Sequence, residues 1–225
     1  MTDAEREAFR AEIRAYLLEN PEVIMEAVQV LEARQQQQQA AQEDVLVAQN
    51  LAAIENDSDS WNGGNLEGDL TLVEFLDYRC GFCRRAHGEV EELVRSDGNI
   101  RIVVKEFPVL GEESVLSSRF AIAVLQLAGA DAYKQAHDAL ITLNSAINTR
   151  VIERLSQQIG VDPEAVKERM DSREVTEVIA KNRSLAQTLG INGTPTFVVG
   201  GQMVRGYAPL ETMRSIVRDV RAARG

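Results

Sequence analysis

Cysteine, histidine and aromatic residues are scarce in this sequence. Its 225 residues include 2 cysteines, 2 histidines and 1 tryptophan, and aromatic residues make up 5% of the chain. Each cysteine can form an internal disulfide only with the other, and both lie in one short motif, which fits either an oxidising or a reducing compartment. No apolar run approaches the length of a membrane-spanning helix.

Basic residues are outnumbered by acidic ones, and the formal net charge is −11. Residues 1–60 contain 13 acidic and 4 basic side chains, a net charge of −9, so the remainder is nearly neutral. No basic stripe is present, and we therefore expect no nucleic-acid partner. The chain also lacks the basic and apolar regions of a secretory signal, which predicts either a cytosolic protein or a mature form without its signal.

The segment Thr71–His87, TLVEFLDYRCGFCRRAH, joins a strand pattern to a Cys-x-x-C pair. The β-branched and aromatic residues at its start predict a buried strand. From Gly81 onward the apolar residues follow helical spacing, which predicts a helix that begins at or just after Cys80. The cysteines therefore lie where a strand gives way to a helix.

A sulfur atom in this position is expected to favour the thiolate. Unpaired backbone N–H groups and the positive end of the helix dipole stabilise negative charge at a helix N-terminus. Neighbouring arginines are expected to lower the thiol pKa further: Arg79, Arg84 and Arg85. We predict a redox dithiol in which Cys80 is the exposed attacking sulfur and Cys83 is the resolving sulfur behind it.

Two other interpretations of the cysteines remain open. A structural disulfide across so short a loop would add little chain-entropy stabilisation. A zinc site would use Cys80, Cys83, His87 and His137, but no second Cys-x-x-C or His-x-His cluster completes its shell. Because a Cys-x-x-C pair in a strand–helix pattern more often indicates redox chemistry, we expect no metal and no cofactor and interpret both histidines as packing residues.

Residues 1–56 are predicted to form a helical arm. One amphipathic helix spans about residues 3–18, Asn20-Pro21 ends it and begins the next, and the second helix continues to about Ile54. Heptad spacing along the second helix links apolar residues through a glutamine-rich middle: Ile24, Val28, Leu31, Gln35, Gln38, Gln42 and Val45. Since so long a helix cannot bury this stripe on itself, we expect an arm that forms homo-oligomers, with a loose tether as the alternative.

Residues 57–69 are predicted to be a linker, because Asn, Asp, Ser and Gly dominate, with Trp61 pinning it onto the body. Residues 70–225 are predicted to form one α/β domain. Strands at about 70–77 and 100–107 flank the first helix as a parallel pair with a right-handed crossover. Helices alone occupy about 112–189, and a β-hairpin and a final helix follow.

Glu74 and Lys105 are expected to take part in the chemistry. Strand alternation places Glu74 on the same face as Leu72 and Leu76, where burial would raise its pKa. A buried carboxyl of this kind can exchange a proton with the resolving thiol. Lys105, on the neighbouring strand, is expected either to pair with Glu74 or to face solvent.

The Thr194-Pro195 bond lies just before a predicted strand, where a cis proline is often retained. A cis bond would present the backbone of Thr194 to an extended substrate beside Cys80. An ordinary trans proline that starts the strand is the alternative.

With these residues in place, the chain resembles the DsbA family of thiol–disulfide oxidoreductases, which have a thioredoxin fold, over about residues 70–223. It is most similar to the ScsC-type group with an N-terminal helical arm, through YLLENPEVIMEAVQVLEARQ at Tyr16–Gln35 and VEFLDYRCGFCRRAH at Val73–His87. The resemblance implies a thioredoxin-like fold with a helical insertion, and the bacterial periplasm with the signal removed. It also implies the following roles: nucleophile Cys80, resolving Cys83, cis-proline Pro195 with Thr194, and buried acid Glu74.

The sequence departs from the strongly oxidising members, which have Pro-His between the cysteines, where this chain has Gly81-Phe82. Without the imidazole, the thiolate is less favoured and the disulfide is less oxidising. A Gly-aromatic pair, together with Thr before the proline, is similar to DsbC- and DsbG-type isomerases. Residues expected to contact substrate are Gly81, Phe82, Thr194 and Pro195.

We therefore predict a disulfide isomerase or reductase that acts on unfolded or misoxidised secreted proteins and exchanges electrons with a membrane redox partner. One rival is a dithiol oxidase that donates disulfides. The other is an envelope interaction protein in which Cys80 and Cys83 bind Cu(I) as soft thiolates.

Overall fold

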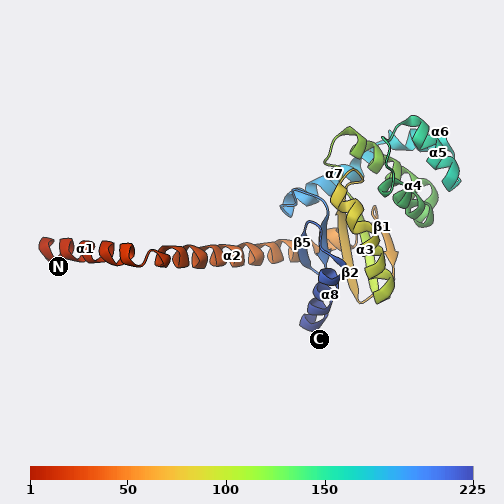
Figure 1. The fold of residues 1–225 in the computed structure, drawn as a ribbon. Helices are drawn as coiled ribbons and strands as arrows, with labels where there is room; N and C mark the ends of the chain where they lie inside the picture. Colours follow the sequence, from red (N-terminus) through yellow and green to blue (C-terminus); the bar gives the residue numbers. More distant parts are fainter. Residues whose placement is uncertain (225) are drawn as a thin grey trace. The chain divides into compact units, whose positions relative to one another are not determined.

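The computed structural model describes residues 1–224. Within it the chain forms two compact units, residues 1–45 and the chain from Leu46 onward. The first unit holds helix α1 (Asp3–Glu19) and most of helix α2 (Glu22–Glu55). The second unit holds a five-stranded sheet with its helices (Figure 1).

Helix α1 begins with a capping box, in which the Glu5 carboxylate accepts the Thr2 N–H and the Thr2 hydroxyl accepts the Glu5 N–H. It ends at Asn20, and α2 starts after Pro21, as the sequence predicts. None of the 17 described residues of α1 is buried, and the ring of Phe9 is 58% exposed. The first unit therefore carries an apolar surface that nothing within it covers.

The sheet contains strands β1 (Trp61–Gly64), β2 (Leu70–Leu76), β3 (Ile100–Glu106), β4 (Thr196–Val199) and β5 (Gln202–Arg205). Their spatial order is β1-β3-β2-β4-β5, so β2 lies at the centre and all seven of its residues are buried. Strands β2 and β3 are parallel and are joined through helix α3 (Gly81–Asp97), whereas β4 runs antiparallel to β2. This arrangement confirms the predicted thioredoxin-like α/β fold.

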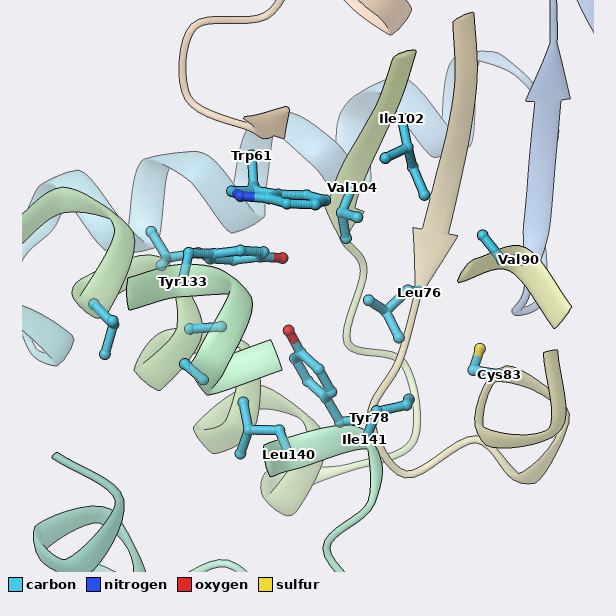
Figure 2. Close-up of a cluster of buried hydrophobic side chains, with 14 of the residues drawn as sticks. Trp61, Leu76, Tyr78, Cys83, Val90, Ile102, Val104, Tyr133, Leu140 and Ile141 are labelled. Carbon is cyan, nitrogen blue, oxygen red and sulfur yellow. The ribbon is translucent and has the colours of Figure 1, made fainter. Parts of the chain in front are cut away.

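The segment 57–69, expected to be a linker, contains strand β1 and extends the sheet beside β3. Asparagine and glycine have low strand propensity, so composition favoured a linker, but pairing with β3 and the burial of Trp61 outweigh propensity. The indole N–H of Trp61 donates to the carbonyl of Ala130 at 3.0 Å, and its ring stacks on Tyr133 at 5.5 Å (Figure 2). Trp61 therefore fastens this segment to the body, as predicted.

A hydrophobic cluster covers each face of the sheet. On one face, side chains of α3 and of helix α8 (Leu210–Arg224) pack against alternate residues of β2 such as Leu72 and Leu76. On the other face, helix α7 (Arg173–Thr188) and the end of α2 pack against Val73 and Phe75. Side chains of successive strand residues point to opposite faces, so neighbouring residues of β2 belong to different clusters.

The last turns of α2 belong to the body rather than to the arm. Val47 is 1% exposed and Ile54 is fully buried, and both pack in the second cluster. The predicted arm at 1–56 is therefore too long at its C-terminal end, because unbroken helical propensity conceals the point at which the helix starts to pack on the sheet. The compact body begins at Leu46.

Between β3 and β4 the chain is helical, as predicted: α4 (Glu112–Ile141), α5 (Thr149–Ile159), α6 (Pro163–Met170) and α7. Helix α4 is kinked at Gly129, whose φ of 81° suits glycine. Figure 1 shows α4, α5 and α6 grouped together. By length and composition α4 would be able to cross a membrane, contrary to the expectation that no apolar run approaches that length, and 44% of its apolar window is buried in the body.

Candidate active site

The two cysteines lie at the junction of β2 and α3. Cys80 is the N-cap of α3 and has extended backbone angles, so its sulfur sits over the first turn of the helix. The preceding turn is closed by a hydrogen bond from the Cys80 N–H to the Asp77 carbonyl at 3.1 Å. The predicted strand-to-helix transition is therefore confirmed.

The loop before β4 brings Thr194 against this helix terminus. The Cys80 thiol donates to the Thr194 carbonyl at 3.1 Å, across 114 residues of sequence. The Thr194-Pro195 peptide bond is cis, as predicted. Antiparallel pairing of β4 with β2, with Thr196 opposite Phe75, holds the loop at this end of the sheet.

Both cysteines are reduced, and both are largely covered. Cys80 is 6% exposed and Cys83 is 1% exposed. The expectation of an exposed attacking sulfur is therefore wrong for this conformation, because the 194–195 loop lies against Cys80. The order of the two is as predicted, since Cys83 lies deeper.

Hydrogen bonds favour the thiolate form of Cys80. The thiol of Cys83 makes the largest contribution, and the Thr194 side chain and the backbone N–H groups of Phe82 and Cys83 add to it. Burial opposes them, because it penalises the charged form. Together they lower the pKa of Cys80 to about 5. A sulfur with this pKa is almost entirely ionised at neutral pH and is a ready nucleophile.

The arginines near the pair do not act as expected. Arg84 donates to the carbonyls of Tyr78 and Leu143, and Arg79 pairs with Glu113. The guanidinium of Arg85 lies over the ring of Tyr207 at 4.3 Å. Each arginine thus fastens α3 or its leading turn to another segment.

Glu74 lies in the core behind the dithiol. It is 5% exposed and shares a sheet face with Leu72 and Leu76, which confirms the predicted burial. Burial first, and then the charges of Glu106 and Cys80, raise the pKa of Glu74 to about 8. Its charge also helps raise the pKa of Cys83, after the hydrogen bond to Cys80 and burial. Glu74 is therefore a mostly uncharged acid near neutral pH and is electrostatically coupled to both thiols.

Lys105 does not join this site. It lies opposite Phe75 in the parallel ladder, on the face of the sheet away from Glu74. The expected pairing with Glu74 is wrong. Glu74 lies opposite Val104, one residue before Lys105 on β3, so the side chains of Glu74 and Lys105 point to opposite faces of the sheet. The expectation that Lys105 faces solvent is also wrong, since its side chain is fully buried and bonds Asp57 at 2.6 Å and the Ala53 carbonyl at 3.0 Å. Its place is structural, at the end of α2.

Asp77 is a positioning residue that the sequence did not reveal. Its side chain is fully buried and accepts the N–H of Arg79 at 2.8 Å. It also accepts the N–H groups of Val109 at 2.8 Å and Leu110 at 3.0 Å, from the loop after β3. Asp77 thereby joins the turn before Cys80 to that loop. An aspartate directly after a buried strand is a typical turn residue, which was the available signal.

Glu106 is a second buried acid that sequence analysis missed. Its Oε1 accepts the hydroxyls of Tyr78 at 2.7 Å and Tyr133 at 2.6 Å (Figure 2 labels both tyrosines). Burial raises the pKa of Glu106 to about 7, although these hydrogen bonds act to lower it. A glutamate at the end of a strand gives no sequence sign of burial, since strand ends usually face water.

Gly81 and Phe82 form the exposed side of the motif. Nothing lies within 4 Å of the position that a Cβ on Gly81 would occupy, and the Phe82 side chain is 60% exposed. Val109 and Leu110 are also exposed, at 42% and 55%. The surface at the dithiol is therefore apolar and open.

The histidines lie apart from the cysteines. Among the described residues, His87 and His137 are grouped with Asp138 as possible metal ligands, and neither cysteine is in the group. This grouping does not provide the Cys–His zinc site considered from the sequence. The dithiol geometry instead allows thiol–disulfide exchange.

Comparison with known families agrees with this geometry. The model of the DSBA-like thioredoxin domain matches residues 71–218, and that of the copper resistance protein ScsC N-terminal domain matches residues 5–38. The chain spans about a quarter of the length of curated relatives such as a Na(+)/H(+) antiporter NhaA 3 of Salinispora tropica. It is 25% identical to that protein over 77% of its own residues and 26% of the relative.

Many solved structures are similar to this chain, and three of them illustrate the likeness. A thioredoxin-like oxidoreductase from Silicibacter pomeroyi is 39% identical, with a TM-score of 0.71, over 76% of this chain and 97% of that one. ScsC of Proteus mirabilis in a transitional conformation is 26% identical, with a TM-score of 0.72, over 99% and 100%. A periplasmic thioredoxin-like protein from Salmonella enterica is 27% identical, with a TM-score of 0.69, over 76% and 95%.

The family match covers most of the chain and includes both cysteines, Glu74 and the Thr194-Pro195 loop. The second match covers the N-terminal helices. The predicted resemblance is thus confirmed in both parts. This chain belongs to the DSBA-like thioredoxin domain family, and its N-terminal helices match the ScsC N-terminal domain.

Proposed function

We propose that the protein is an isomerase or reductase for disulfides of secreted or envelope proteins. The observation that carries this proposal is the Cys80 thiolate, which is stabilised at the start of α3 by hydrogen bonds from neutral groups: the Cys83 thiol, the Thr194 side chain and backbone N–H groups. Neutral donors stabilise a thiolate less than a cationic imidazole between the cysteines would, so the disulfide is less oxidising. A less oxidising disulfide is reduced more readily, and the reduced dithiol is able to attack a wrong disulfide.

Attack by Cys80 begins both reactions. Its thiolate bonds one sulfur of a client disulfide, and the other client sulfur leaves as a thiolate. In isomerisation, a client thiolate attacks the mixed disulfide, a different client disulfide forms, and Cys80 is released unchanged. In reduction, the Cys83 thiolate attacks the Cys80 sulfur of the mixed disulfide, and the client sulfur leaves as a thiolate. The client disulfide is then reduced to two thiols, and the Cys80–Cys83 dithiol is oxidised to a disulfide.

Glu74 supports the reduction branch. Cys83 must lose its proton before it attacks, and its environment raises the pKa of its thiol. A buried carboxylate whose pKa is raised to about 8 is a base matched to that proton near neutral pH. Glu74 would accept the proton as Cys83 attacks and return it when the disulfide is reduced again.

Clients would bind the apolar surface around the motif. Phe82, Val109 and Leu110 present exposed side chains there, and Asp77 ties the loop of the last two to the turn before Cys80. Unfolded and misoxidised proteins expose apolar segments, so this surface fits them better than it fits a charged partner. Thr194 and Pro195 would border the bound segment beside Cys80.

The remaining parts of the proposal concern location and partners. The likeness to a periplasmic thioredoxin-like protein supports a periplasmic location for this chain. There, a membrane redox partner would return electrons to the Cys80–Cys83 disulfide after each reduction. The exposed apolar residues of α1 and α2, including Phe9 and Ile24, support homo-oligomers formed through the N-terminal helices.

Two assays on the full-length chain test the proposal: reduction of insulin and reactivation of scrambled ribonuclease. We expect activity in both. The variant Cys83→Ser should lose insulin reduction and keep part of the ribonuclease activity, because client thiols release the mixed disulfide without Cys83. Thr194→Val should slow both, since it removes a hydrogen bond to the Cys80 thiolate, whereas the exposed control Thr188→Val should not.

Other results would support the rival functions. A strongly oxidising redox potential with no ribonuclease reactivation would indicate a dithiol oxidase. Tight stoichiometric binding of Cu(I), lost in Cys80→Ser and unaccompanied by turnover of disulfides, would indicate the copper-binding alternative. Either result would overturn the isomerase or reductase proposal.

A further inference from the structure

A cavity of about 460 Å³ lies beside the sheet, between α3 and α4. It is lined by His87, Glu91, Lys134, His137 and, from the sheet, Glu74. The redox mechanism uses none of these except Glu74. Both histidines of the chain lie at this one cavity, although they are 50 positions apart in the sequence.

The histidine rings face each other across the two helices. Their centroids are 5.2 Å apart, His137 is 6% exposed, and the His87 side chain is 16% exposed. Asp138 follows His137 on α4 and places a carboxylate oxygen 3.5 Å from His87 Nε2. One ligand atom from each of these three residues lies within 4.8 Å of the others.

These spacings are close to those of a bound metal ion. Zinc takes imidazole nitrogen and carboxylate oxygen at about 2.0–2.2 Å, so ligand atoms in a tetrahedral shell lie roughly 3.4 Å apart. The contact between His87 and Asp138 already has this separation. Shifts of about 1 Å would bring the nitrogen of His137 into the same shell. Rotation of the partly exposed side chains of His87 and Asp138 can supply these shifts.

The hydrogen-bond network holds His137 in a ligating form. Its Nδ1 lies 3.2 Å from the Tyr78 hydroxyl, which donates its own proton to Glu106 at 2.7 Å. The tyrosine oxygen therefore accepts the Nδ1–H of His137, and the network assigns the lone pair to Nε2. A second group that fixes the tautomer in this way is typical of histidines that ligate metals.

A cation already occupies part of this cluster. The ammonium of Lys134 lies 2.6 Å from both the Glu91 and the Asp138 carboxylates. The Lys134 side chain is 37% exposed, and its long stem lets it turn into solvent. The carboxylates therefore favour positive charge, and their present partner can be exchanged.

We propose that His87, His137 and Asp138 form a binding site for a divalent transition-metal ion of the zinc class, which displaces the ammonium of Lys134. Two imidazoles and one carboxylate suit such an ion, whereas calcium and magnesium prefer oxygen ligands throughout. Three protein ligands leave a fourth position for water. A metal here would clamp α3, which carries the dithiol, to α4 of the helical insertion.

The test uses the full chain with Cys80→Ser and Cys83→Ser, so that thiolates do not contribute. Titration with Co²⁺ should give saturable visible absorption at one ion per chain, and Zn²⁺ should abolish it. Asp138→Asn and His87→Gln should each weaken binding by more than about tenfold. The matched control Asp131→Asn, an exposed acid on the same helix, should bind as the parent does.

The variant Lys134→Met separates a metal site from a cluster that only stabilises the fold. Removal of the competing ammonium should tighten Co²⁺ binding, and Zn²⁺ should raise the melting temperature of the parent but not that of Asp138→Asn. The proposal is overturned if the cysteine-free chain binds no Co²⁺ saturably. It is equally overturned if Asp138→Asn and His87→Gln bind as tightly as Asp131→Asn.

Discussion

The sulfur of Cys80 lies 3.1 Å from the carbonyl oxygen of Thr194, although 114 positions separate the two residues. The pairing of β4 with β2 creates this contact, because Thr196 lies opposite Phe75 in the ladder. The strand that leads to the dithiol and the strand that follows the proline loop are therefore direct neighbours. The nucleophile and the loop beside it form one site.

The first prediction concerns the ionisation of Cys80. Thiolate absorption at 240 nm should titrate with a midpoint near pH 5, so the sulfur is about 99% ionised at pH 7. Because the folded pKa lies below the ordinary value of 9.0, ionisation stabilises the folded reduced protein fully above pH 9, and this stability is lost as the pH falls through 5.

Cys83 makes the largest contribution to this shift, which provides a matched pair of variants. Cys83→Ala should raise the pKa of Cys80 and slow its alkylation at pH 6. Cys83→Ser should keep more of the shift, because a hydroxyl still donates. A Cys80 pKa that stays at the parent value in both variants would show that the helix terminus, rather than Cys83, stabilises the thiolate.

The second prediction concerns Glu74→Gln. Burial raises the pKa of Glu74 from 4.5 to about 8. Between these pH values the unfolded chain releases a proton that the folded protein keeps, so the free energy of unfolding falls as the pH rises from about 4.5 to 8. The amide avoids this cost, and the variant should be more stable by about 3 kcal/mol at pH 7 in urea unfolding. Resolution of a mixed disulfide by Cys83 should nevertheless become slower. A stability difference that does not change with pH would contradict the raised pKa.

The third prediction separates Lys105 from the redox chemistry. Lys105→Met should lower the free energy of unfolding by about 3–5 kcal/mol, because it removes the buried cation that pairs with the buried carboxylate of Asp57. Lys181→Met is the matched control, since Lys181 contacts the same Asp57 from a half-exposed position and should change stability by less than about 1 kcal/mol. Folded Lys105→Met protein should reduce insulin at the normal rate. Loss of that activity with stability intact would restore a catalytic role.

The fourth prediction concerns the N-terminal helices. Deletion of residues 1–45 should leave the melting temperature of the body and the Cys80 pKa unchanged, because the body begins at Leu46. Deletion of residues 1–56 should destabilise the body, since it removes Val47 and Ile54 from the cluster on one face of the sheet. The two proteins differ by only 11 residues.

Light scattering on the same proteins tests the proposed oligomer. The full chain should have a multiple of the monomer mass, and the chain without residues 1–45 should be monomeric. A monomeric full chain would rule out an oligomerisation role for the exposed apolar residues of α1 and α2.

Local sequence determined the redox element itself. A run of β-branched and aromatic residues, a Cys-x-x-C pair and a helical stripe place Cys80 at a helix N-terminus without help from distant residues, because periodicity and end effects act over a few residues. Alternation along β2 likewise predicted that Glu74 is buried. The resemblance of the chain to the DsbA family then implied the thioredoxin-like fold with its helical insertion.

Only the tertiary structure decided which distant groups meet. The face on which Lys105 lies depends on the register of β2 against β3, and the contacts of the three arginines depend on helices that pack later in the chain. The cluster of His87, His137 and Asp138 exists because α3 and α4 lie side by side. Such contacts are selected by packing over the whole body, where the burial of one side chain determines the partners of another, and no local pattern records them.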